Sequence, residues 1–191
     1  LRFEAAKEFC DILNNERKGS AEITGMAGVI PSVTKFGMAS LLPKNDVTVD
    51  KNFEVYVDGI NSEGTENRNK VLLKCCKNSI AIQYDNIVDM KRDDFREVFG
   101  GKDLIYIYHN NIDAKGDNSK TEREVFESVE ETFKELKSLI NSLVNNVSAV
   151  NIYITSDHGF IYKRGSLTES DKTPKESDSD SFENKRFILS L

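Results

Sequence analysis

The stretch Asn151-Ile-Tyr-Ile-Thr-Ser-Asp-His-Gly-Phe160 decides the fold that this sequence predicts. Apolar and polar residues alternate over its first half, which is typical of a β-strand, and the strand leads directly into Asp157, His158 and Gly159. In open α/β sheets, ligands bind just outside the carboxyl ends of the strands. A carboxylate and an imidazole there offer an oxygen and a nitrogen ligand to zinc or manganese. The alternative is a β-turn in which Asp157 and Gly159 serve the backbone alone.

Helix and strand patterns alternate along the rest of the chain. Helices are predicted over residues 1–13, 34–42, 65–77, 92–99 and 121–144. Strands are predicted over residues 21–30, 47–49, 53–57, 79–84 and 103–109 and around Ile152, and residues 185–191 resemble the opening of a strand. Because two of the strands are nearly continuous apolar runs, we expect an α/β fold with a mostly parallel central sheet and helices on both faces.

Length and composition narrow the class of protein. The 191 residues, 38% hydrophobic and 30% charged, predict one globular domain over residues 1–191. The net charge of −6 argues against broad, non-specific nucleic-acid binding. We expect no membrane association, because no apolar run reaches the ~18 residues of a span. Three cysteines without a Cys-x-x-Cys pair exclude a zinc ribbon and favour reduced thiols in the cytoplasm.

Both ends of the chain fall within regular patterns. The first helix pattern starts at Leu1 without a preceding N-cap, and the last strand pattern runs to Leu191. We therefore expect a domain cut from a longer protein at both ends. Residues 166–184 are rich in Ser, Asp, Glu and Lys, which predicts a polar loop or an insertion.

A hydroxyl group lies at the start of the second predicted helix, between Pro31 and Pro43. Such a hydroxyl becomes a nucleophile if a metal ion lowers its pKa, and a helix N-terminus favours phosphate. Thr34 is the candidate, with Ser32 as its nearest competitor. The alternative is that one of the two is only a helix N-cap.

Two carboxylates, Asp113 and Asp117, lie four residues apart in a turn-like segment after the strand predicted at 103–109. Such a pair holds a divalent cation, although a solvated acidic loop gives the same pattern. His109 ends the same strand, and we interpret it as a satisfied, partly buried histidine rather than as a ligand.

Taken together, these segments resemble the alkaline phosphatase superfamily and, within it, the PglZ domain. Leu1-Arg-Phe-Glu-Ala-Ala6 is similar to the segment that follows the family's first metal-binding Asp, and residues 30–43 to the nucleophile segment. Tyr108-His-Asn-Asn-Ile-Asp113 and Thr155-Ser-Asp-His-Gly159 are similar to the two later metal-ligand segments. The order of these motifs extends the resemblance over nearly the whole chain.

The resemblance implies a two-metal phosphoryl-transfer site with zinc or manganese. By this analogy Thr34 is the nucleophile and also touches the first metal, which Asp157 and His158 hold together with an Asp expected before Leu1. Asp113 and Asp117 would hold the second metal. The superfamily usually has His in place of Asp117, and an oxygen ligand there favours a harder ion such as manganese. The family's last His, expected beyond residue 158, is not among the residues of this chain.

Two functions remain open at this point. The first is a metal-dependent phosphohydrolase or phosphodiesterase that acts on nucleotide or oligonucleotide phosphodiesters, in a bacterial phage-defence or signalling protein whose other domains and system proteins are its partners. The second is an inactive scaffold or binding module of the same fold. A Ser-His-Asp hydrolase and a dinucleotide-binding site are disfavoured, because the chain has neither a Gly-x-Ser-x-Gly nor a Gly-x-Gly-x-x-Gly motif.

Overall fold

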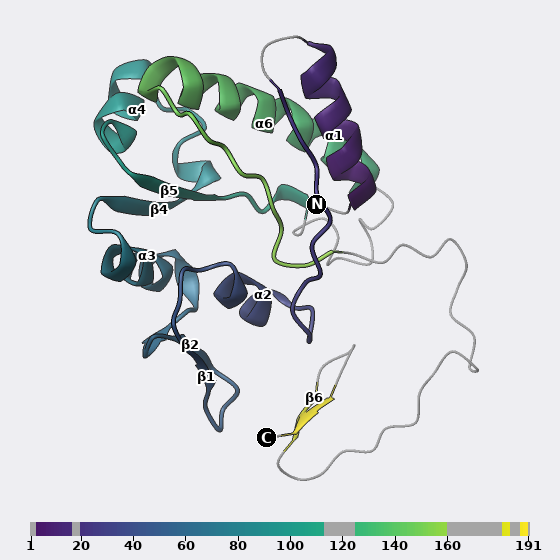
Figure 1. The fold of residues 1–191 in the computed structure, drawn as a ribbon, viewed down its shortest axis with the longest axis vertical. Coiled ribbons are helices and arrows are strands. Elements are labelled where there is room, and N and C mark those ends of the chain that lie inside the picture. Colours follow the sequence, from purple (N-terminus) through teal and green to yellow (C-terminus); the bar gives the residue numbers. More distant parts are fainter. Residues whose placement is uncertain (1–2, 17–19, 113–124, 160–180, 184–187, 191) are drawn as a thin grey trace, which may run out of the picture.

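The computed structural model describes residues 3–16, 20–112, 125–159, 181–183 and 188–190 (Figure 1). The helices are α1 Phe3–Asn15, α2 Thr34–Ser40, α3 Gly64–Cys75, α4 Arg92–Phe99 and α6 Val125–Val147, with a 3-10 turn at Tyr84–Asn86. The strands are β1 Val47–Val49, β2 Val55–Val57, β3 Ile60–Asn61, β4 Ser79–Gln83, β5 Leu104–Tyr108, β6 Ser181–Glu183 and β7 Ile188–Ser190. The mixed helix and strand content confirms the α/β class, and most predicted helices begin and end within a few residues of the observed ones.

A parallel strand pair forms the centre of the described fold. β4 and β5 pair from Ser79↔Leu104 to Gln83↔Tyr108. Because successive side chains of a strand point to opposite faces, the isoleucines of both strands face one way, and Ala81 and Tyr106 face the other. The isoleucine face packs on α4 and α6, whereas the opposite face packs on α3, α2 and β2 (Figure 1). Helices therefore cover both faces of this pair, as predicted.

The large parallel sheet is not seen in the described residues. β1, β2 and β3 form an antiparallel sheet, and β6 pairs with β7 in an antiparallel hairpin. The predicted strand pair at 47–49 and 53–57 is thus confirmed as β1 and β2. Within the predicted polar segment 166–184, residues 181–183 are the strand β6, and the remainder lies outside the described residues.

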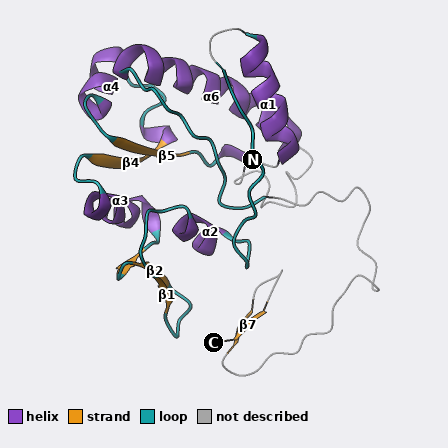
Figure 2. Cartoon of the chain, viewed as in Figure 1, coloured by secondary structure: helices purple, strands orange, loops and turns teal. Residues whose placement is uncertain are grey.

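The strands predicted at 21–30 and around Ile152 were wrong for the described structure. Both segments run as loops in Figure 2 and join no sheet there. Ile30, Val150 and Tyr153 are each 90% exposed. Alternating hydrophobicity gives a segment the side chains of a strand, but a strand also needs a neighbour for its backbone hydrogen bonds.

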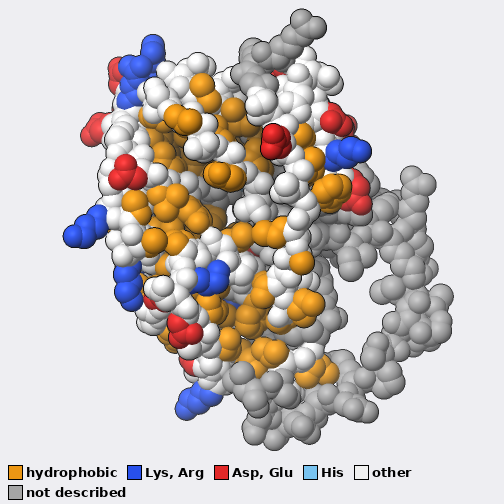
Figure 3. Space-filling model, in the orientation of Figure 1, with side chains coloured by type: hydrophobic (Ala, Val, Ile, Leu, Met, Phe, Trp, Pro, Cys, Tyr) orange, Lys and Arg blue, Asp and Glu red, His pale blue; other side chains and the backbone are white. Residues whose placement is uncertain are grey.

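The space-filling view in Figure 3 shows apolar side chains gathered over the middle of one face of the molecule.

Of the described helices, none combines the length and the apolar composition that crossing a bilayer requires.

The packing predicts a sharp contrast between two neighbouring leucines of α3. Leu72 is fully buried between α3 and the sheet, whereas Leu73 is 40% exposed. We expect Leu72→Ala to lower the free energy of unfolding by about 2–5 kcal/mol, because it leaves a cavity. Leu73→Ala should change it by no more than about 0.5 kcal/mol. Chemical denaturation of both variants measures the difference, and equal losses would contradict the assigned core.

Candidate functional site

The hydroxyl of Thr34 lies beside the imidazole of His158. Val33 occupies the N-cap position of α2 in an extended conformation and makes no side-chain cap hydrogen bond, so that Thr34 is the first helical residue. The Thr34 Oγ1 atom lies 3.0 Å from His158 Nε2. The expectation that Thr34 meets the Asp157–His158 pair is therefore met, and the N-cap alternative is wrong for this residue. Ser32 is exposed and makes no hydrogen bond to the pair in the described chain.

Gly37 allows this contact, because α2 packs directly on the backbone of Asp157. A Cβ atom at Gly37 would overlap the carbonyl oxygen of Asp157 and would lie 2.9 Å from its Cβ. Thr34 and Gly37 are three residues apart and therefore lie on the same face of the helix. The segment that descends from α6 in Figure 1 thus ends against this face.

The contact of His158 with the Gly159 carbonyl favours the tautomer that carries its proton on Nδ1. The Nδ1 atom lies 3.1 Å from the carbonyl oxygen of Gly159, which only accepts hydrogen bonds, so Nδ1 is the donor. The Nε2 lone pair then faces both Thr34 Oγ1 and Asp157 Oδ2, which is 3.5 Å away. In a Ser-His-Asp triad the hydroxyl and the acid face different ring nitrogens. Here both face Nε2, which argues against a triad.

The donor atoms of this cluster fit a metal ion. Asp157 Oδ2 is buried and has no hydrogen-bond partner in the part of the chain that is described. A carboxylate oxygen and an imidazole lone pair that face each other repel unless a proton or a cation lies between them. Ligands of a tetrahedral zinc ion, at roughly 2.0–2.1 Å from the metal, are about 3.3 Å apart. The separations of 3.0 and 3.5 Å around Nε2 are similar.

The rest of the predicted ligand set is not tested. Asp113 and Asp117 lie outside the described residues. Among the residues that are described, no three His, Cys, Asp or Glu side chains are grouped as a metal site. His109 is partly buried and hydrogen-bonded, as expected: its side chain is 13% exposed, and its Nε2 atom lies 2.7 Å from Glu135 Oε2.

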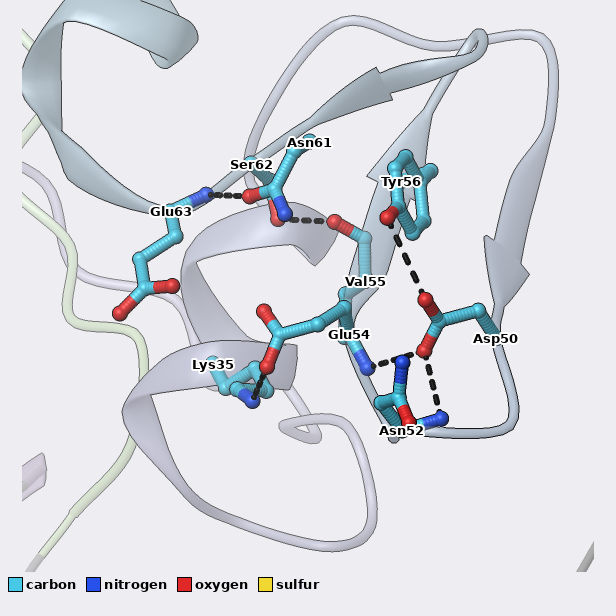
Figure 4. A network of polar contacts seen from close by, with 9 residues as sticks. All are labelled: Lys35, Asp50, Asn52, Glu54, Val55, Tyr56, Asn61, Ser62 and Glu63. Atoms are coloured by element: carbon cyan, nitrogen blue, oxygen red, sulfur yellow. Dashed lines mark hydrogen bonds and ion pairs between the residues drawn. The ribbon is translucent and has the colours of Figure 1, made fainter.

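A cavity of about 260 Å³ opens beside Thr34, between α2, β2 and the start of α3. Lys35 and Glu54 form an ion pair at its wall, with Nζ 2.6 Å from Oε1 (Figure 4). The hydrogen bond from Lys35 holds the pKa of Glu54 below its usual range. Asp50 supports this wall, because its carboxylate accepts hydrogen bonds from the backbone N–H groups of Asn52 and Glu54. The N–H of Glu54 lowers the pKa of Asp50.

This cavity is not predicted by any pattern in the sequence. Apart from Thr34 and Lys35, which belong to the segment 30–43, its lining comes from segments without a motif, and the packing of α2 against β2 and α3 joins them. The residues that line it are Thr34, Lys35, Glu54, Val55, Asn61, Ser62, Glu63 and Arg68.

The whole chain, residues 1–191, matches the family model of the BREX system PglZ alkaline phosphatase-like domain. This chain belongs to the PglZ family. Over 190 residues it is 52% identical to the alkaline phosphatase-like protein PglZ of Bacillus cereus (strain H3081.97), a match that covers 100% of the chain. It is 34% identical over 195 residues to the alkaline phosphatase-like protein BrxZ of Escherichia coli O9:H4 (strain HS), which covers 99% of the chain. No solved structure matches.

The matched region makes up 22% of the length of each of these relatives. The match to the family model confirms, at the level of the family, the resemblance inferred from the nucleophile and metal-ligand segments. The family is described as the alkaline phosphatase-like PglZ domain of the BREX system.

Gly37 provides a test of how this PglZ domain assembles its site. We expect Gly37→Ala to push α2 away from Asp157, because the new methyl group overlaps backbone atoms that have no alternative rotamer. The free energy of unfolding should fall by about 1–3 kcal/mol. Gly28→Ala is the matched control, because nothing lies within 4 Å of a Cβ at that position. Denaturation curves compare the two, and a harmless Gly37→Ala would show that the close approach is not required.

Proposed function

We propose that this PglZ domain is the phosphoryl-transfer domain of a metal-dependent phosphohydrolase or phosphodiesterase, with Thr34 as nucleophile. The contact between Thr34 Oγ1 and His158 Nε2, next to the buried Oδ2 atom of Asp157, is the observation that supports it. A hydroxyl among a carboxylate and an imidazole is the donor set that a phosphoryl-transfer enzyme uses to activate an alcohol.

Each residue has a defined task in this proposal. Asp157, His158 and Thr34 would hold one divalent cation, and Asp113 and Asp117 would hold the second. Bound cations lower the pKa of the hydroxyl and neutralise the charge of the phosphate. Thr34 Oγ1 is the attacking atom. The hydrogen bond from Nδ1 of His158 to the Gly159 carbonyl fixes the ring so that Nε2 faces the hydroxyl.

The substrate class in this proposal is a phosphate ester, with nucleotide or oligonucleotide phosphodiesters as the first choice. The family description, BREX system PglZ alkaline phosphatase-like domain, motivates a role in phage defence. We propose zinc or manganese as the ions, since imidazole suits zinc and carboxylates suit manganese. The remaining domains of the parent protein and other proteins of the defence system are the proposed partners, in the cytoplasm.

The alternative is a domain that keeps the fold as a binding scaffold without catalysis. Asp117, at the position where the superfamily usually has His, is the observation that favours it. The two proposals differ in turnover and in metal binding, which the next two experiments measure.

Removal of the nucleophile should abolish turnover in the full-length protein. With bis-p-nitrophenyl phosphate and manganese or zinc, we expect Thr34→Ala to lower kcat by about 10³-fold or more, because it removes the proposed attacking oxygen. Ser32→Ala is the matched control, since this hydroxyl lies two residues away and is exposed; it should keep wild-type rates. Equal turnover by wild type and Thr34→Ala would remove the assigned role of Thr34.

Metal binding should stabilise the folded protein. A ligand that binds only the native state contributes about 2.7 kcal/mol when its concentration is 100 times its Kd. We therefore expect manganese or zinc to raise the melting temperature of the full-length protein, and His158→Ala and Asp157→Asn to reduce this shift. An unchanged melting temperature in the wild type would favour the scaffold alternative.

A further inference from the structure

Arg68 stands out among the side chains that line the cavity beside Thr34, because it is a cation held in place without a carboxylate. Its Nε–H donates a hydrogen bond to the carbonyl oxygen of Ser62 at 2.9 Å. Its guanidinium carbon lies 4.9 Å from the centroid of the Tyr108 ring. No carboxylate in the described ranges forms an ion pair with it, whereas Lys35, which also lines the cavity, is paired with Glu54.

The surroundings of Arg68 hold its side chain in one orientation. Burial raises the pKa of Tyr108 to about 12, and so its ring is neutral and attracts the cation through its π face. The Nε–H bond to Ser62 uses one of five N–H donors. The cost of ordering this long side chain is therefore met within the protein, before any ligand binds.

Of the two cationic side chains that line the cavity, Lys35 is paired with a carboxylate and Arg68 can bind an anion. The charges of Lys35 and Glu54 cancel in a direct ion pair. The other acidic side chain of the lining, Glu63, is exposed, and water screens its charge. Arg68 is half-buried, and a charge there attracts an anion more strongly.

The cavity has room for a group of many atoms. Its volume of about 260 Å³ is several times the roughly 30 Å³ that one water molecule occupies in the liquid. Thr34, at the start of α2, and Arg68, on α3, both line this cavity, so it lies between the two helices. A group attacked by Thr34 would therefore leave room for an adjoining part of the same substrate.

We propose that this cavity binds the part of the substrate next to the phosphate that Thr34 attacks, and that Arg68 binds a second phosphate of that substrate. Guanidinium is the side chain best suited to phosphate, because its planar fork donates two parallel hydrogen bonds. The substrate class is then a nucleotide or oligonucleotide with two or more phosphates. The assignment of the second phosphate rests on the proposed role of Thr34.

A binding experiment tests this proposal without relying on turnover. Titration calorimetry on the full-length Thr34→Ala protein, with manganese present, compares thymidine 3′,5′-bisphosphate with thymidine 5′-phosphate. We expect the bisphosphate to bind roughly 10- to 100-fold more tightly, the contribution of hydrogen bonds to a charged group. Arg68→Gln should remove this preference, and Arg68→Lys, which keeps the charge but not the fork, should keep part of it.

Lys70→Gln is the matched control, because Lys70 lies on the same helix, is exposed and does not line the cavity. It should keep the full preference. Equal affinity for the two ligands, or a preference that survives Arg68→Gln, would overturn the assignment. These outcomes are independent of the turnover assay, and so a missing nucleophile and a missing phosphate subsite are told apart.

A second measurement covers the case in which Arg68→Gln does not fold. Phenylglyoxal modifies arginine side chains, and peptide mass spectrometry locates the modified residue in the otherwise unaltered protein. We expect thymidine 3′,5′-bisphosphate to protect Arg68 at concentrations where thymidine 5′-phosphate does not. Equal protection by both ligands, or none by either, would contradict binding of a second phosphate.

Discussion

The close approach of helix α2 to the backbone of Asp157 is the contact on which the site depends. Only a glycine at position 37 allows it, because any Cβ there would overlap the carbonyl group of Asp157. Backbone atoms on both sides of this contact leave no side chain that moves aside. The distance between Thr34 and His158 is therefore set by the main chain, which is the most rigid way in which a fold positions two reacting groups.

The electrostatics of the cluster follow from this geometry. Asp157 Oδ2 is buried next to the nitrogen that carries the lone pair of neutral His158. A cation between these two atoms would be attracted by both, which is why the pair fits a metal ion. This arrangement separates the site from a Ser-His-Asp triad, in which the acid stabilises the far nitrogen of the ring.

The cavity beside Thr34 is lined by an ion pair, whose charges cancel, and by the oriented cation of Arg68. The Lys35–Glu54 pair joins α2 to β2, and the Asp50 turn fixes the backbone of that wall. Arg68 is held by the carbonyl oxygen of Ser62 and by the ring of Tyr108. Of these side chains, Asp50, Glu54 and Arg68 belong to no motif with a fixed spacing. The substrate side of the site is thus built by tertiary packing, whereas the nucleophile side follows short sequence motifs.

The sequence by itself determined the helices, the parallel pair, the family and the candidate residues Thr34, Asp157 and His158. Helical periodicity and apolar strands are local properties, and the ligand motifs are short. The tertiary structure alone decided that the Thr34 hydroxyl meets Nε2 of His158, that Gly37 permits this contact and that Arg68 lines the same cavity. It also corrected the strands predicted at 21–30 and around Ile152, because a strand depends on a neighbouring backbone that no local pattern contains.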